Sequence, residues 1–199
     1  MSIEIQHLSK TFFPGTSREH KALKNVNLSI QEGDFITIVG GNGAGKSTFL
    51  NAIAGNFALD EGTISFGGHQ IEHTADFERA AYISRVFQDP MQGTAPRMTV
   101  AENLALANRR GQKRSLFKTS SKEELQQFEA LVAPLGLGLE DRLHTEIGLL
   151  SGGQRQAISL LMATMNAPQL LLLDEHTAAL DPKTQRKIMQ KTQETIEEK

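Results

Sequence analysis

The chain has 199 residues, a formal net charge of −2 and no cysteine, and its length predicts one domain, or one domain with an inserted subdomain. The charge argues against nucleic acid as a main partner, and the absence of cysteine excludes disulfides and thiolate metal sites. The sequence shows no leader of the secretory type and no apolar run long enough to cross a bilayer, so we expect neither a signal peptide nor a membrane span.

The first half of the chain contains several segments typical of β-strands. Residues 3–8 and 22–30 alternate apolar and polar side chains, which favours half-exposed antiparallel strands. Residues 34–39 form an apolar, β-branched run and predict a buried parallel strand. Residues 62–68 and 80–87 predict two further strands, the first of them ending in a glycine turn.

A glycine-rich segment follows the predicted buried strand. It fits the pattern G-x-x-x-x-G-K-[ST] of a phosphate-binding P-loop at every required position, and residues 49–54 then favour a helix. Glycine lets backbone N–H groups turn towards an anion, and the helix N-terminus adds a positive dipole end. The candidate phosphate-binding residues are Gly40, Gly41, Asn42, Gly43, Ala44, Gly45, Lys46, Ser47 and Thr48.

Two side chains of this loop have specific expected roles. We expect Lys46 to reach the β- and γ-phosphates and to take part in catalysis, and Ser47 to bind Mg²⁺ through its hydroxyl. The alternative is a glycine-rich turn that binds nothing. The apolar run before the loop and the helical pattern after it argue against that alternative.

The character of the sequence changes after Asp89-Pro90. Capping-box patterns begin at Thr99 and Ser121, each followed by apolar residues at helical spacing, and residues 154–165 predict a third helix. Residues 90–165 therefore indicate a helical insert in an α/β core. The densest basic cluster, residues 109–114, is either an interaction patch or a solvated helix end, and the second is the commoner case.

A second chemical site is predicted at the end of a buried strand. The apolar run Leu170–Leu173 leads directly into Asp174 and Glu175. Ligands of α/β sheets bind at the carboxyl ends of strands, which is where both carboxylates would lie. We expect Asp174 to hold Mg²⁺ through a water molecule, and Glu175 to act as the general base that polarises the attacking water.

A second glycine-rich loop before a helix, Leu150-Ser151-Gly152-Gly153-Gln154, lies between the P-loop and the Asp-Glu strand. In that context it resembles the signature motif of the ATP-binding cassette (ABC) family, and the resemblance covers essentially the whole chain. It implies that the active unit is a head-to-tail dimer in which one copy touches the γ-phosphate of ATP held by the other. The residues implied in this contact are Ser151, Gly152, Gly153 and Gln154.

Three further positions match motifs of the family. Gln88 resembles the Q-loop glutamine, which implies contact with Mg²⁺ and the attacking water and a catalytic role. Phe12 resembles the aromatic residue that stacks on adenine; its neighbour Phe13 is an alternative, and either ring could instead belong to the core. Asp181 resembles the D-loop aspartate, which implies a place at the dimer interface.

The chain also departs from the family pattern. His176 stands where the family usually has proline, and Gly41 stands where proline is common in the P-loop. The family's switch histidine follows a further core strand, and the sequence ends at Lys199 before that strand. We therefore expect a domain truncated at its C-terminus.

The resemblance implies an α/β fold of the P-loop NTPase type. The expected core has a mostly parallel sheet, an antiparallel β-subdomain and an inserted helical subdomain. Within a single domain of residues 1–199, residues 1–89 and 166–199 would form the core with its β-subdomain, and residues 90–165 the helical subdomain.

The resemblance also implies a function. The chain would be the ATP-hydrolysing subunit of a bacterial ABC transporter at the cytoplasmic face of the cell membrane, with ATP and Mg²⁺ as cofactors. Its partners would be a second copy of itself, a substrate-binding protein and transmembrane permease subunits that dock near Gln88 and residues 91–96. The imported solute would be small, such as an amino acid.

Two alternatives remain open at this stage. A soluble single-cassette ABC ATPase without a transport role, such as that of iron–sulfur cluster assembly, carries the same motifs. The other alternative is a chain that binds ATP but hardly hydrolyses it, because the switch histidine is missing.

Overall fold

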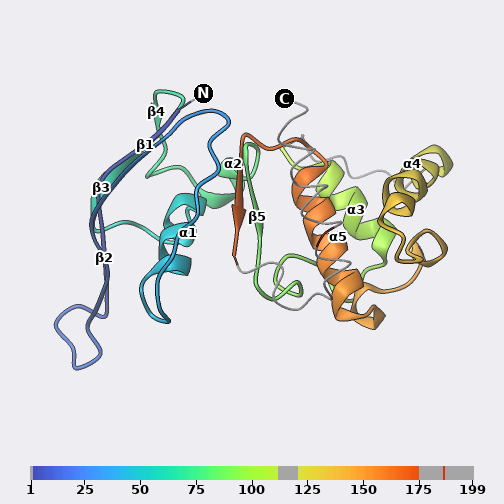
Figure 1. Ribbon diagram of the computed structural model, residues 1–199, viewed down its shortest axis with the longest axis horizontal. Coiled ribbons are helices and arrows are strands. Elements are labelled where there is room, and N and C mark those ends of the chain that lie inside the picture. The colour runs from blue at the N-terminus through green and yellow to red at the C-terminus, as the bar shows by residue number, and fades with distance from the viewer. Residues whose placement is uncertain (1, 112–120, 175–185, 187–199) are drawn as a thin grey trace. The chain divides into compact units, whose positions relative to one another are not determined.

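The computed structural model describes residues 2–111, 121–174 and 186. The chain divides into two compact units, residues 1–80 and 81–199, which we describe one at a time (Figure 1). The expected division into a core and a 90–165 helical subdomain stays a prediction.

The first unit is built on an antiparallel sheet. Its strands are β1 (Ile3–Phe12), β2 (His20–Ile30), β3 (Glu61–Phe66) and β4 (His69–Gln70), and their order in the sheet is β2-β1-β3-β4. Every neighbouring pair in this sheet is antiparallel. Alternation in β1 buries Ile3 and Ile5 on one face and leaves Glu4 on the other, as the sequence predicts for a half-exposed strand.

Two helices complete the first unit. Helix α1 (Lys46–Ala54) begins directly after the glycine-rich loop and ends at Gly55, and α2 (Asp76–Arg79) is a single turn. The buried face of α1 consists of Phe49, Leu50, Ala52 and Ile53. The P-loop helix is therefore held by an apolar stripe that begins three residues after Lys46.

The predicted parallel strand at residues 34–39 is not present as a strand. Its apolar side chains lie in solvent, with Phe35 exposed to 69% and Val39 to 89%. A strand needs a hydrogen-bonded neighbour, and within residues 2–80 the sheet ends at β2 and β4 without pairing to this segment. The residue pattern predicts a preference for burial, but it does not supply the neighbouring strand.

Over residues 81–111 and 121–174, the second unit combines a parallel pair of strands with three helices. Strands β5 (Ile83–Val86) and β6 (Leu170–Leu173) pair in parallel, with Val86 opposite Leu173. The helices are α3 (Val100–Asn108), α4 (Lys122–Val132) and α5 (Gly152–Thr164), with short 3₁₀ segments at Ala133–Leu135, Glu140–Arg142 and Ile147–Leu149. Residues from β5 and from all three helices share one buried apolar core.

The predicted helix starts at Thr99 and Ser121 are confirmed. The Thr99 hydroxyl accepts the Glu102 N–H while the Glu102 carboxylate accepts the Thr99 N–H, and the Ser121 hydroxyl accepts the Glu124 N–H. Among the helices of the described ranges, none combines the length and the apolar character that a bilayer span requires.

Candidate nucleotide-binding site

The P-loop segment adopts a conformation that depends on glycine. Gly43 and Gly45 have positive φ, at +78° and +87°, and Gly45 is the N-cap of α1. A Cβ on Gly45 would also collide with the backbone carbonyl of Ala22. Position 45 thus admits only glycine for two separate reasons, a left-handed backbone and a close approach of β2.

Lys46 turns back over the loop that precedes it. Its ammonium donates hydrogen bonds to the carbonyl oxygens of Gly40 (2.7 Å) and Gly41 (3.1 Å). Helix α1 has no side-chain cap and no acidic residue in its first turn. The loop therefore carries a lysine cation and an uncompensated helix N-terminus, the two features that attract a phosphate. Ser47 and Thr48 lie in the first turn of the same helix.

The far end of α1 is fixed by a residue that the sequence analysis did not identify. Arg79 is only 2% exposed, and its guanidinium donates to the carbonyl oxygens of Ala52 and Ile53 at 3.1 and 2.8 Å. A cation at a helix C-terminus compensates its orphan carbonyls and its negative dipole end. No local sequence pattern predicts this contact, because Arg79 lies 26 residues beyond Ile53.

The two candidate stacking residues differ in their surroundings. Phe12, at the end of β1, makes an edge-to-face pair with Phe57, with ring centroids 5.5 Å apart. Phe13 has a φ of +52° and is 63% exposed. Phe12 is therefore the ring that the fold orients, and Phe13 is the one that it leaves in solvent.

In the second unit, Gln88 and Asp174 follow the carboxyl ends of two paired strands. The Asp174 N–H donates to the carbonyl oxygen of Val86 at 3.1 Å, which extends the β5–β6 register by one residue. Gln88 comes two residues after Val86. Both residues are predicted Mg²⁺ ligands, and the parallel β5–β6 pairing puts the ends of the strands that precede them at one edge of the pair.

The Asp174 carboxylate also forms an ion pair. Its Oδ2 accepts a hydrogen bond from Arg85 Nη2 at 3.1 Å. The Asp174 side chain is 13% exposed and the Arg85 side chain is 10% exposed. The Arg85 guanidinium lies over the Phe87 ring, 4.5 Å from its centroid. Asp174 would thus share its carboxylate between an arginine and any metal that it helps to hold.

The donor types at the predicted metal positions suit Mg²⁺. A hydroxyl, an amide oxygen and a carboxylate, from Ser47, Gln88 and Asp174, are oxygen ligands of the kind that Mg²⁺ accepts beside water and phosphate. Within residues 2–111 and 121–174, no three His, Asp or Glu side chains gather into a cluster that could hold a metal.

The signature segment begins α5 with a reciprocal cap. Ser151 Oγ accepts the Gln154 N–H at 3.2 Å, and Gln154 Oε1 accepts the Ser151 N–H at 3.1 Å. The Gln154 amide also donates to the Leu137 carbonyl at 3.0 Å. Gly152 has open space around its Cβ position. Gln154, predicted to contact nucleotide, therefore already has a structural task at the start of the helix.

The loop after Gln88 is anchored inside the second unit. Asn103, 1% exposed, accepts the Ala95 N–H (2.8 Å) and donates to the Ala95 carbonyl (3.1 Å). Met91 contacts the Arg155 guanidinium of α5, with 3.6 Å between sulfur and nitrogen. Residues 91–96, the predicted coupling surface, are thus held against both α3 and α5.

The basic residues at the end of α3 interact within the chain. Arg109 pairs with Glu124 at 3.1 Å, and Arg110 donates to the Ser84 hydroxyl at 2.8 Å. Burial lowers the pKa of the Arg110 guanidinium. These contacts argue against an interaction patch for this part of the cluster, and the burial of Arg110 also departs from the solvated helix end that the sequence favours.

Some predicted residues lie outside the described part of the chain. Glu175, His176 and Asp181 are among them. Phe12 and the P-loop belong to the first unit, whereas Gln88, Asp174 and the signature segment belong to the second, and each set is described within its own unit.

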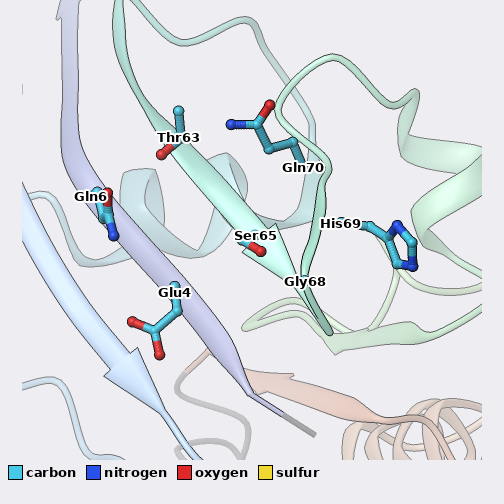
Figure 2. Close-up of a pocket in the computed structure, with 7 residues that line it drawn as sticks. All are labelled: Glu4, Gln6, Thr63, Ser65, Gly68, His69 and Gln70. Carbon is cyan, nitrogen blue, oxygen red and sulfur yellow. The ribbon is translucent and has the colours of Figure 1, made fainter.

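A polar pocket of about 480 Å³ lies elsewhere, on the solvent face of the antiparallel sheet. Figure 2 shows side chains of β1 and β3 lining it side by side, in the register that places Glu4 opposite Ser65 and Gln6 opposite Thr63. Its lining residues are Glu4, Gln6, Thr63, Ser65, Gly68, His69 and Gln70, and none is a predicted site residue.

Comparisons with known proteins place the chain in a family. The family model of the ABC transporters matches residues 23–178. The tyrosine transport ATP-binding protein of Clostridioides difficile (strain R20291) is 41% identical over 197 residues, which span 99% of this chain and 78% of that protein. The phosphonates import ATP-binding protein PhnC of Alcaligenes faecalis is 38% identical, over 94% of this chain and 67% of its own length.

Solved structures agree with the sequence matches. The dimeric ATP-binding cassette MJ0796, bound to ADP and Pi in a post-hydrolysis state, superposes with a TM-score of 0.83 at 32% identity. The match covers 98% of this chain and 83% of that one. These likenesses confirm the expected fold class, an α/β P-loop NTPase. The chain belongs to the ABC transporter family of ATP-binding cassettes, and it is an ATPase of that family.

Proposed function

We propose that this ATPase drives the import of a small solute, such as an amino acid, through separate permease subunits in a bacterial membrane. The observation that carries the proposal is its 41% identity, over 99% of the chain, to a tyrosine transport ATP-binding protein. Other relatives named as import ATP-binding proteins take phosphonates, hemin and sulfate or thiosulfate. The import role is common to these names, and the amino acid is the finer part of the proposal.

The P-loop is the proposed binding site of the ATP phosphates. Lys46 would exchange the carbonyl oxygens of Gly40 and Gly41, which it now contacts, for oxygens of the β- and γ-phosphates. That exchange replaces hydrogen bonds from the ammonium to neutral carbonyl oxygens by bonds to anionic phosphate oxygens, which add the attraction between opposite charges. Phe12 would stack on the adenine ring.

Hydrolysis needs a positioned water and neutralised phosphate charge. Ser47, Gln88 and Asp174 are the proposed residues that hold Mg²⁺, which supplies charge neutralisation when it is bound. Glu175 is the proposed general base, and Gln88 would help to orient the water. Loss of a Mg²⁺ ligand and loss of the general base would therefore impair different parts of the same reaction.

The signature segment is proposed to act on ATP held by a second copy of the chain. Gly152 and Gly153 begin α5, and an anion at a helix N-terminus meets its free N–H groups and its positive dipole end. The cassette MJ0796 was solved as a dimer with ADP and Pi. Binding of ATP would therefore close a dimer, and hydrolysis would release it.

The remaining partners follow from the import role. Permease subunits would dock near Gln88 and residues 91–96, and a substrate-binding protein would deliver the solute. The chain would then work at the cytoplasmic face of the cell membrane. The anchoring of residues 91–96 to α3 and α5 supports this docking place, because a force applied there reaches the signature helix directly.

The dimer is tested by sedimentation of the Glu175→Gln protein with and without ATP and Mg²⁺. The substitution should slow hydrolysis by about 10²–10⁴-fold, the usual contribution of a general base, while leaving binding intact. We expect a monomer without ATP and a dimer with it. The double variant Lys46→Ala/Glu175→Gln is the control and should remain monomeric.

Two results would count against the proposal. If the Glu175→Gln protein hydrolyses ATP as fast as the parent, Glu175 is not the general base. A protein that binds ATP by calorimetry yet stays monomeric would remove the self-closing dimer. The amino-acid part is tested by co-reconstitution with the permease subunits in vesicles, where uptake of labelled tyrosine should depend on ATP.

A further inference from the structure

A lysine, an aspartate and two aromatic rings meet where β1 ends. Lys10 Nζ donates to Asp60 Oδ1 and to the Ala58 carbonyl, both at 2.8 Å. The same ammonium lies 5.7 Å from the centroid of Phe12 and 5.5 Å from that of Phe57. Both distances are within the range of a cation–π contact.

The chain on both sides of this cluster is tied together as well. Asp60 Oδ2 accepts the Thr11 N–H at 2.6 Å, and the Asp60 N–H donates to the Ser9 carbonyl at 3.2 Å. The Lys10 side chain is 16% exposed, so its stem is largely packed. The hydrogen bonds from the Lys10 ammonium and the Thr11 N–H hold the pKa of Asp60 below its ordinary value.

The two partners of the Phe12 ring in this cluster are also close to each other. The Lys10 ammonium, the Phe57 ring and the Phe12 ring are separated by nearly equal distances of 5.5–5.7 Å. Seen from the Phe12 centroid, the ammonium and Phe57 therefore lie in neighbouring directions and not on opposite sides of the ring, so the two do not sandwich it.

We propose that Lys10 is a positioning residue for nucleotide binding, which with Asp60 and Phe57 holds the Phe12 ring ready to stack on the adenine of ATP. This inference rests on the proposed stacking role of Phe12. A ring that is oriented before binding loses less side-chain freedom when the base arrives. Phe13, exposed and outside the cluster, would lose more of that freedom.

The test compares two ligands that share only the phosphates. Isothermal titration calorimetry with Mg²⁺ measures ATP, which needs the stacking ring, and inorganic tripolyphosphate, which does not. Lys10→Met keeps the packed stem and removes the charge. It should weaken ATP about two- to tenfold, the cost of immobilising one side chain, and leave tripolyphosphate unchanged. Lys24→Met, at an exposed lysine of β2, is the matched control and should change neither.

Two further variants separate orientation of Phe12 from other effects. In a Phe12→Ala background, Lys10→Met should cause no further loss of ATP affinity, since no ring remains to be oriented. Phe57→Leu keeps apolar bulk and removes the partner ring, so it should repeat the selective loss of ATP affinity. It also keeps the inference testable should Lys10→Met fold poorly.

Several outcomes would overturn the inference. Equal weakening of ATP and tripolyphosphate by Lys10→Met would mean a general loosening of the unit, and unchanged ATP affinity would mean that the cluster has no role in binding. If Lys10→Met weakens ATP binding as much in the Phe12→Ala background as in the parent, Lys10 contacts the nucleotide itself. If Phe12→Ala leaves the ratio of the ATP and tripolyphosphate affinities unchanged, Phe12 does not stack on adenine and the inference is wrong. The proposed import function is not affected by that result.

Discussion

The P-loop and the signature segment are both glycine-rich loops that lead into a helix, yet they begin their helices in opposite ways. Helix α1 starts at Gly45 with no side-chain cap, and the Lys46 ammonium, bonded to two loop carbonyls, adds a positive charge at that end. Helix α5 starts at Ser151 with a complete reciprocal cap from Gln154. One loop depends on backbone conformation and a cation, and the other on two neutral side chains.

The two helix starts therefore offer different interactions to a ligand. The P-loop holds a cation that can change partners, so an anion gains a strong new interaction there. The cap of the signature segment is formed by its own Ser151 and Gln154, and the segment carries no charged side chain. It therefore offers an anion mainly the remaining backbone N–H groups and the helix dipole. Strong binding of one ATP should therefore reside in the P-loop, and the signature segment should contribute only when a nucleotide is already in place.

The largest expected effect is on Lys46. Lys46→Ala removes the charge-assisted bonds to the phosphates and should weaken ATP binding about ten- to hundredfold, as measured by calorimetry. The hydrogen bonds that it makes in the free loop are to exposed carbonyls, so stability should change by less than about 1 kcal/mol. Unaltered ATP affinity in this variant would place the phosphates elsewhere.

The next largest effect is expected at Gly45, where the P-loop should respond differently from the signature segment. Gly45→Ala forces alanine into a backbone with φ +87° and against the Ala22 carbonyl. We expect the free energy of unfolding to fall by more than about 2 kcal/mol in chemical denaturation. Gly41→Ala, in the same loop but with open space around its Cβ position, is the control and should stay within about 0.5 kcal/mol of the parent.

The glycine that begins α5 should behave differently from Gly45. Gly152 lies in a helix and its Cβ position is open. Gly152→Ala should leave the unfolding free energy unchanged or raise it by up to about 1 kcal/mol, because alanine favours helix. A loss as large as that of Gly45→Ala would show that the two loops are constrained alike.

A smaller effect is expected at the cap of α5. Ser151→Ala removes the acceptor of the Gln154 N–H and should lower the unfolding free energy by about 1 kcal/mol. Ser151→Asn provides another good cap and should restore most of that loss, which thermal unfolding followed by circular dichroism can measure. Equal losses in both variants would mean that the cap contributes little.

The smallest effect concerns pH. The cap of α3 uses Glu102, and hydrogen bonds from the Thr99 N–H and hydroxyl hold the pKa of Glu102 below its ordinary value of 4.5. A lowered folded-state pKa adds stability that is present above pH 4.5 and lost as the pH falls through the folded value. Glu102→Gln should therefore flatten the acid side of the stability curve slightly, whereas Gln154→Ala should cost the same at every pH. An identical pH dependence of the parent and Glu102→Gln would contradict this.

Much of the local structure could be predicted from the residues in order. The strands at residues 3–8 and 22–30, the helix starts at Thr99 and Ser121, and the helices that follow the two glycine-rich loops are properties of neighbouring side chains. The family follows from motifs of the same local kind, since a glycine-rich anion loop needs particular residues at fixed spacing. The prediction failed at residues 34–39, because burial of a strand depends on a partner that the segment does not contain.

Contacts between residues far apart in the chain depend on how the elements pack in three dimensions. Lys10 and Asp60 are separated by 50 residues, and Arg85 and Asp174 by 89, so no local pattern could predict either pair. The sequence alone determined which chemical groups are present and where glycine permits a turn. Only the fold decided which groups meet, because long-range contacts form when whole strands and helices pack rather than when individual residues prefer one another.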